Sequence, residues 1–320
     1  MDKYDVVVIG GGAAGLAGAQ ALARFRRRVL VIDAGNPRNA PADGVHNYLG
    51  HDGRPPRELL AIGREELERY GAEVRQGEVQ SIEPGFRVTL ADGTAVEARR
   101  LLVTTGLQDE LPDIPGLAER FGRDVLHCPY CHGWEVRDQA IGVIATSAMA
   151  LHQVEMFRQL SDDVTLFLHT APEPSEEDWE RLAARGISVV TGKVEGLEIT
   201  EDRISGVRLS TGQVIPRQAL AIAPRFTARA DVLKQLGLEP VQMLAGDYVI
   251  GSYIPAEPDG RTSVPGIWVA GNVSDLRAQV ISSAAAGLGA GASINMDLIA
   301  EDTNEALAAY RTRYQQEASR

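Results

Sequence analysis

Cys128 and Cys131 are the only cysteines among the 320 residues, and two residues separate them. Two thiols at this spacing can close a small disulfide or share a metal ion. A zinc site would need two further ligands at a comparable spacing, and His127 and His132 lie too close along the chain to complete a tetrahedron with both thiols. A structural disulfide is not expected in a reducing cytosol. The pair therefore favours redox exchange over a metal site, with two inert buried thiols as the alternative.

His132 directly follows the second cysteine. An imidazole titrates near neutral pH, so it can take the proton that a thiol must lose or return the proton that a thiolate must gain. We predict this catalytic role for His132, and a loop histidine without a role is the alternative. His46 and His51 flank residues 47–50, and the sequence alone does not relate either of them to the cysteines.

A glycine-rich turn near the start of the chain has the form of a dinucleotide-binding loop. Gly10, Gly12 and Gly15 follow the apolar run Asp5–Ile9 in the spacing G-x-G-x-x-G. The first glycine permits the tight turn, the second lets the backbone approach a pyrophosphate, and the third lets a helix pack on the strand. Asp33 ends the next apolar run, where an acidic side chain binds ribose hydroxyls. The context predicts a dinucleotide site, and a simple tight turn is the alternative.

The hydrophobic pattern predicts two similar strand–helix–strand units, each followed by a hairpin. The first unit begins at Asp5 and the second at Ala140. Segments 106–116 and 238–247 are predicted linkers. We expect strands at 5–9, 29–32, 79–82, 86–90, 101–103, 140–144, 164–168, 188–190 and 266–269, helices at 16–23, 57–70, 149–160, 178–185 and 280–299, and a separate polar helix from Glu305 capped by Asn304.

The turn of the second unit lacks the features that a nucleotide needs. Residues 145–150 contain no glycine where the backbone would approach a pyrophosphate. The end of the following strand offers no arginine for a 2′-phosphate, and the acidic residues between Glu173 and Asp178 would repel one. We therefore predict two dinucleotide-binding folds of α/β type and only one bound nucleotide.

Composition excludes some classes of partner. The 32 Lys and Arg residues are outnumbered by 44 Asp and Glu, which gives a net charge of −12. This balance argues against nucleic acid and against an anionic membrane surface. The segment 280–299 is rich in Ala, Gly and Ser and is interrupted by Asn295 and Asp297, so we do not expect it to cross a membrane. Without a secretory signal at the start, a cytoplasmic location is predicted.

At four places in order the chain resembles the low-molecular-weight thioredoxin reductase family. The matching segments are the glycine turn, Thr104–Gly106 (TTG), the CxxC pair, and residues 262–272 (TSVPGIWVAGN), which are similar to the family's second flavin motif. The small residues of 280–299, with Gly287 and Gly291 four apart, are predicted to pack closely inside the first domain.

The resemblance implies a specific division of the chain. An FAD domain would be built from residues 1–116 and 243–320, and a central domain of residues 117–242 would carry the dithiol on a degenerate nicotinamide-binding fold. It also implies FAD, rather than NAD, in the first site, and a homodimer. The residues it assigns to FAD are Gly10, Gly12, Ala13, Ala14, Gly15, Asp33, Ala34, Asn47, Val79, Thr105, Gly106, Gly271, Asn272, Gln279 and Val280.

Family members usually end the second flavin motif in Asp, where this chain has Asn272, which implies a neutral contact to the ribityl chain of the flavin. Two other departures point to one branch of the family. His132 follows the second cysteine where family members usually have Asp, and the nicotinamide glycines and the basic motif are absent. The chain thus resembles the dithiol oxidases of gliotoxin- and holomycin-type biosynthesis. By this resemblance Cys131 exchanges electrons with FAD, Cys128 meets a small-molecule dithiol, and O2 accepts the electrons to give H2O2.

Two other functions remain open at this point. One is a thioredoxin reductase-like disulfide reductase that uses NADPH or another donor such as ferredoxin, with a small redox protein meeting Cys128. The arginines among residues 24–28 could form a docking patch for ferredoxin or simply a solvated helix end. The other is a flavin-binding sensor or scaffold without turnover, against which the retention of both cysteines argues.

Overall fold

The apolar run near the start of the chain forms β1 (Asp2–Ile9), a central strand of a seven-stranded sheet. The structure is a computed structural model that describes residues 2–318. β1 pairs in parallel with a strand on each side, which explains its continuous apolar end. The strand order is β3-β2-β1-β6-β5-β4, with β19 beside β6. The other strands of this sheet are β2 (Val29–Asp33), β3 (Glu73–Gln76), β4 (Val79–Glu83), β5 (Arg87–Leu90), β6 (Ala95–Val103) and β19 (Ile267–Val269).

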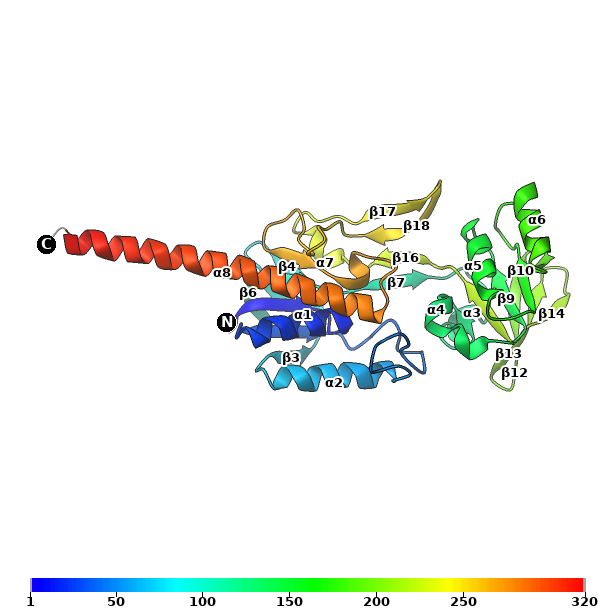
Figure 1. Cartoon of the computed structure of the whole chain (residues 1–320), viewed down its shortest axis with the longest axis horizontal. Coiled ribbons are helices and arrows are strands. Elements are labelled where there is room, and N and C mark those ends of the chain that lie inside the picture. The colour runs from blue at the N-terminus through cyan, green and yellow to red at the C-terminus, as the bar shows by residue number, and fades with distance from the viewer. Residues whose placement is uncertain (1, 319–320) are drawn as a thin grey trace.

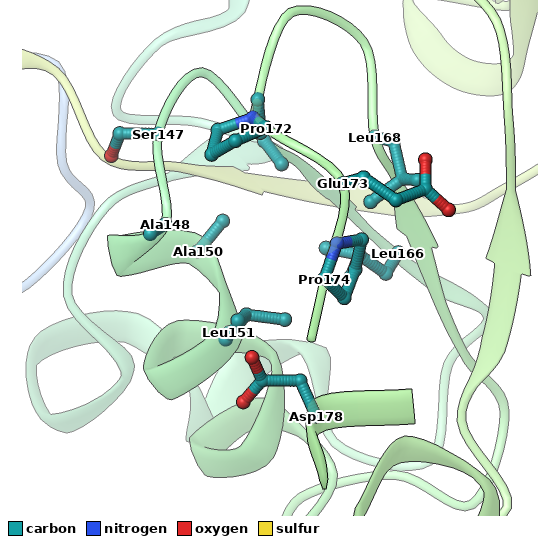
Figure 2. Close-up of a pocket in the computed structure, with 12 residues that line it drawn as sticks. Ser147, Ala148, Ala150, Leu151, Leu166, Leu168, Pro172, Glu173, Pro174 and Asp178 are labelled. Atoms are coloured by element: carbon teal, nitrogen blue, oxygen red, sulfur yellow. The ribbon is translucent and has the colours of Figure 1, made fainter. Parts of the chain in front are cut away.

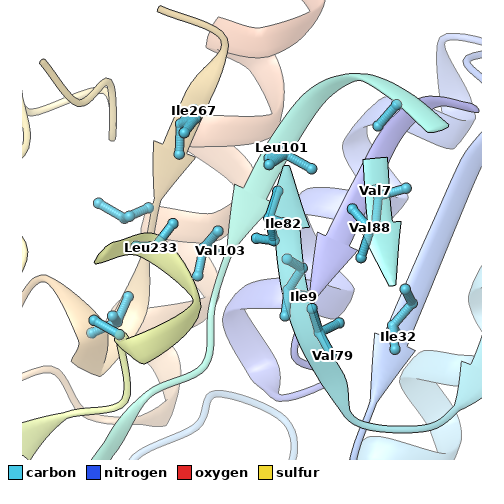
Figure 3. Close-up of a cluster of buried hydrophobic side chains, with 14 of the residues drawn as sticks. Val7, Ile9, Ile32, Val79, Ile82, Val88, Leu101, Val103, Leu233 and Ile267 are labelled. Carbon is cyan, nitrogen blue, oxygen red and sulfur yellow. The ribbon is translucent and has the colours of Figure 1, made fainter. Parts of the chain in front are cut away.

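Alternate residues of β1 serve two apolar layers, one on each face of the sheet. Val6 and Val8 pack with α1, α2 and α8, whereas Val7 and Ile9 pack with the β4–β5 hairpin and with α7. Figure 3 shows the second layer, to which α7 contributes Leu233. The helices of this domain are α1 (Ala13–Arg24), α2 (Pro56–Glu68), α7 (Asp231–Lys234) and α8 (Val280–Ala318), with a 3₁₀ turn η2 (Gly271–Val273).

Glycines allow α8 to lie directly on α1. A Cβ built on Gly287 would lie 1.9 Å from the Ala14 carbonyl oxygen, and one on Gly291 would lie 2.6 Å from that of Gly18. Larger side chains would push the two helices apart, so the predicted close packing of this small-residue segment is confirmed. Across residues 2–318, no helix combines the length and the apolar run that crossing a membrane requires.

The prediction of a separate C-terminal helix capped by Asn304 is wrong, because α8 runs unbroken from Val280 to Ala318. No Gly or Pro interrupts the segment between the two predicted helices. Ion pairs also hold this stretch: Arg27 lies 2.7 Å from Asp302, and Arg99 lies 2.5 Å from the same carboxylate. Figure 1 shows the last turns of α8 projecting far beyond the body of the molecule.

The second strand–helix–strand unit builds the central domain, at the opposite end of the molecule from the C-terminus (Figure 1). Its parallel sheet has the order β11-β10-β9-β15-β8. One face packs on α5 and α6, and the other packs on the antiparallel sheet β12-β13-β14. The elements are α3 (Leu117–Arg120), β8 (Val125–Leu126), α4 (Pro129–His132), η1 (Trp134–Val136), β9 (Ile141–Ile144), α5 (Met149–Phe157), β10 (Val164–Phe167), α6 (Glu176–Ala184), β11 (Ser188–Val190), β12 (Val194–Thr200), β13 (Arg203–Leu209), β14 (Val214–Pro216) and β15 (Ala219–Ile222).

Both segments predicted as linkers contain strands instead. They belong to a four-stranded sheet of order β17-β18-β16-β7, in which polar and apolar residues mix and the strand pattern is weak. Because Ala228, Leu233 and Leu238 pack in the core of the first domain, we propose that the central domain ends near residue 224 rather than at 242. The strands are β7 (Leu107–Glu110), β16 (Arg225–Ala228), β17 (Val241–Ala245) and β18 (Tyr248–Tyr253).

Candidate functional site

One cavity of about 720 Å³ lies where the two domains meet, a size typical of ligand sites. It brings together residues from the glycine turn, the end of β2, the start of α8 and the CxxC segment. The predicted site residues that line it are Gly10, Gly12, Ala13, Ala14, Asp33, Ala34, Val79, Thr105, Gly106, Cys128, Cys131, His132, Gly271, Asn272, Gln279 and Val280. Gly15 and Asn47 lie outside this lining.

The glycine turn leaves room on the side where a pyrophosphate would lie. A Cβ built on Gly12 would meet no atom within 4 Å, so this backbone is open to the cavity. Gly15 instead packs against the backbone of the turn, and a Cβ there would lie 1.9 Å from the Gly10 carbonyl oxygen. Gly10 itself has a φ of +106°, a conformation that favours glycine. An exposed loop backbone at the start of α1 fits the phosphates of FAD.

Asp33 closes the turn at the end of β2. Its carboxylate accepts a hydrogen bond from the Gly11 N–H at 3.1 Å and lies 2.9 Å from the Arg64 guanidinium. These two contacts fix the carboxylate at the cavity wall, in the position that a ribose requires.

Asn272 lies on η2, beside the start of α8. Its side-chain amide donates to the carbonyl oxygens of Asp275 and Ala278, each at 2.9 Å. These bonds hold the loop that leads into Gln279 and Val280. Asn47 serves a different contact: its amide donates to the Tyr130 carbonyl oxygen at 2.7 Å, so it contacts the CxxC segment rather than the cavity wall.

The two cysteines face each other at the cavity. Cys128 precedes the single turn of α4, and the Sγ of Cys131 lies 2.6 Å from that of Cys128, with both thiols free. The Cys131 S–H donates to Cys128, and the Cys131 and Tyr130 backbone N–H groups also face it; together these lower the pKa of Cys128 to about 7, against the effect of burial. The same pairing, together with burial, raises the pKa of Cys131. Cys128 is therefore the reactive thiolate of the reduced pair.

Arg38 supplies positive charge to this dithiol, and the sequence did not indicate it. Its guanidinium pairs with both Asp109 carboxylate oxygens at 2.7 and 2.6 Å and lies 5.2 Å from the centre of the Phe226 ring. Its charge lowers the pKa of both thiols. Only the fold brings the loop after β2 close to residues 128–131, so spacing along the chain gives no indication of this role.

His132 lies in the same cavity, and burial lowers its pKa. It is therefore neutral near pH 7 and can accept a proton. The His46 ring lies edge-on to it, with the ring centres 6.3 Å apart. His51 is turned away from this cluster, because its ring packs 5.8 Å from the Tyr48 ring and its Nδ1 accepts from Arg54.

The corresponding site of the central domain has nearly closed. Figure 2 shows the hollow at the carboxyl ends of β9 and β10, which measures about 60 Å³. Ala145, Ser147 and Ala148 stand where a glycine turn would be needed. Glu173 and Asp178 add two carboxylates, and none of the lining residues is basic. This hollow is much smaller than the first cavity, and none of its lining side chains could offer a positive charge to a phosphate.

Comparison with known proteins agrees with this architecture. Residues 4–291 match the pyridine nucleotide-disulphide oxidoreductase family. Thioredoxin reductase sirT of Leptosphaeria maculans is 29% identical over 319 residues, covering 93% of this chain and 95% of that protein. The crystal structure of HlmI is 45% identical, covers 97% of each chain and has a TM-score of 0.89. An oxidoreductase from Agrobacterium tumefaciens is 36% identical, covering 93% of this chain and 99% of its own, with a TM-score of 0.86. The chain therefore belongs to the pyridine nucleotide-disulphide oxidoreductase family, as a thioredoxin reductase-like enzyme that binds FAD and exchanges thiols and disulfides.

Proposed function

We propose that this enzyme is an FAD-dependent dithiol oxidase. It would convert a small-molecule dithiol into an intramolecular disulfide, with O2 as the electron acceptor and H2O2 as the product. The observation that carries the proposal is the contrast between two sites. The dithiol opens on a cavity of about 720 Å³ that fits FAD, whereas the hollow in the central domain measures about 60 Å³.

The chain's own groups suit the binding of FAD in the large cavity. The open backbone at Gly12 would hold the pyrophosphate and Asp33 the ribose, while Asn272 and Gln279 would line the flavin end. Gly15 would act from outside the lining by letting α1 approach β1. When bound there, FAD supplies a two-electron acceptor that O2 can reoxidise.

The cysteine pair carries out the exchange with the substrate. A substrate thiolate attacks Sγ of Cys128 in the oxidised pair, the Cys128–Cys131 bond breaks, and Cys131 leaves and takes up a proton. The second substrate thiolate then attacks the substrate sulfur of the mixed disulfide, which closes the substrate disulfide and releases Cys128. The substrate has lost two electrons and two protons, and the pair has gained them. A Cys128 pKa of about 7 makes it a good leaving group.

His132 moves the protons of this exchange. Its half-buried imidazole is neutral near pH 7, because partial burial lowers its pKa, so it can deprotonate the attacking substrate thiol. Arg38 favours the thiolate form of the released cysteine. Both groups act without a nicotinamide, which is consistent with the closed hollow of the central domain.

A ferredoxin-fed reductase finds less support in the arginines of residues 24–28. Arg27 pairs with Asp302 at 2.7 Å and donates to Asn295 at 2.9 Å. Arg28 lies over the Tyr4 ring, 4.6 Å from its centre. Arg27 is therefore held within the chain and withdrawn from any docking patch, whereas Arg24, Arg26 and Arg28 stay exposed.

We also propose that the enzyme is a homodimer joined along α8. Residues 303–316 of this helix are all exposed, and an isolated helix of such a length is only marginally stable in water. A second copy would cover the exposed apolar side chains, which fall within about 100° of the helix circumference, as expected for one packing face. They are Ile281, Leu288, Met296, Ile299, Leu307, Tyr310 and Tyr314.

An anaerobic titration of the purified yellow protein tests the reaction. We expect dithiothreitol to bleach the flavin, and air to restore the colour with one H2O2 per dithiol. NADPH and NADH should leave the colour unchanged within the same time. Rapid bleaching by NADPH would refute the oxidase and favour the reductase.

A further inference from the structure

A set of titratable groups leads from His132, in the cavity that the dithiol lines, to the protein surface. The His46 Nε2 lies 3.3 Å from a Glu135 carboxylate oxygen, and its Nδ1 lies 3.5 Å from an Asp52 carboxylate oxygen. Those carboxylates are 44% and 71% exposed, whereas the His46 side chain is 24% exposed. On its inner side His46 lines the cavity, where its ring lies edge-on to that of His132.

The chemistry of the pair can use such a route. Each return of Cys128 and Cys131 from dithiol to disulfide releases two electrons and two protons. FAD would take up the electrons together with one proton, so the other proton needs an acceptor until the flavin is reoxidised. His132 can hold only one proton at a time, and its burial disfavours keeping it.

We propose that His46 is a positioning residue of the dithiol site that relays protons between His132 and solvent. This role rests on the proposed dithiol oxidase activity and adds a residue to it. The His46 ring has a carboxylate near each of its nitrogens, Asp52 at Nδ1 and Glu135 at Nε2, so a proton can leave it toward either one. The ring centres are 6.3 Å apart, so the proton crosses through an ordered water or through Glu135, which contacts His46 and acts electrostatically on His132.

The charged groups around the relay favour outward movement of the proton. Asp52, Glu135 and the His132 ring face His46, and Asp43 acts on His132 from the same loop region. The proton therefore passes from the half-buried His132 ring toward carboxylates that are open to water. The reverse path returns a proton when Cys131 leaves as a thiolate.

His46 also joins the two domains, because Glu135 belongs to the central domain and His46 to the first. A purely structural role would make His46→Gln weaken the docking of the CxxC segment. The two roles differ in one property: a missing proton carrier can be replaced by a small diffusing base, whereas a missing contact between domains cannot.

The test follows anaerobic flavin bleaching by dithiothreitol in stopped flow from about pH 6 to 9, in the FAD-loaded wild type and in His46→Gln. A positioned base contributes about 10²–10⁴-fold, and we expect the loss of this second carrier to slow bleaching about tenfold and to change the pH profile. Added imidazole should restore the rate. His51→Gln is the matched control: it removes a histidine from the same loop that does not line the cavity, so its rate and profile should match the wild type.

Each other outcome has a definite meaning. Equal rates and equal pH profiles in the wild type and His46→Gln would refute the relay and leave the oxidase standing. A slow variant that imidazole does not restore would also refute it, in favour of a structural contact. If dithiothreitol fails to bleach even the wild type, the oxidase itself is refuted and the relay with it.

Discussion

Replacing Cys131 with alanine removes the hydrogen-bond donor that does most to lower the pKa of Cys128 to about 7. Burial, which raises the pKa of Cys128, is then opposed only by the backbone N–H groups and by Arg38, which still favour the thiolate. We expect the pKa of Cys128 to rise to about 8.5, the ordinary value of a cysteine, or above it. The variant also cannot close the disulfide, so Cys128 stays available for measurement.

The change can be measured as the rate of alkylation by iodoacetamide against pH. At pH 7 the thiolate fraction falls about sixteenfold when the pKa moves from 7 to 8.5. A more basic thiolate is also a better nucleophile. With a Brønsted slope of about 0.4–0.5, the same pKa increase raises the reaction rate of the thiolate itself about fivefold. Cys131→Ala should therefore react about threefold more slowly than the reduced wild type at pH 7 and about fivefold faster above pH 9.

The decisive result is that the curves of alkylation rate against pH for the wild type and for Cys131→Ala cross. A change in the accessibility of Cys128 would shift the whole curve by one factor without moving its midpoint. Curves that run parallel, with an unchanged midpoint near pH 7, would refute the assignment of Cys131 as the donor. Mapping the alkylated peptide should show Cys128 as the first thiol modified in the wild type, because the pKa of Cys131 is raised in the pair.

Three further changes test separate parts of the structure. Cys128→Ser should abolish H2O2 formation from dithiothreitol while the protein stays yellow; substantial turnover would contradict the exchange. Gly12→Val should lose FAD at unchanged far-UV circular dichroism, because a Cβ there meets no protein atom within 4 Å but occupies the open cradle; full flavin content would contradict the cradle. Leu307→Glu places a charge in the exposed stripe of α8 and should convert a dimer to a monomer in sedimentation velocity, and an unaltered sedimentation coefficient would exclude this stripe as the interface.

The sequence pattern predicted those parts of the fold whose conformation is determined by residues that are neighbours in the sequence. The strand ending at Ile9, the glycine turn and the start of α1 follow one another directly, so residue type and spacing are enough. β7 and β16 could not be predicted in this way, because their short, mixed sequences are stabilised by pairing between residues more than 110 positions apart, such as Glu110 with Arg225. The same holds for the stretch of α8 between the two predicted helices, where Arg27 and Arg99 from elsewhere in the chain pair with Asp302.

In the candidate site, too, some residues could be predicted from their sequence neighbours, whereas others depend on contacts formed only in the fold. Cys128, Cys131 and His132 are adjacent in sequence, and their chemistry could be predicted from that adjacency. Arg38 and His46 act on them from a loop about 80 to 90 positions earlier, where nothing local distinguishes a residue at the cavity from His51, which points away from it. Whether a histidine here serves the dithiol depends on the docking of the two domains, which is a property of the assembled cores and not of any segment. A second functional residue in an enzyme of this kind is therefore best sought by asking which side chains of the first domain contact the CxxC segment once both cores are formed.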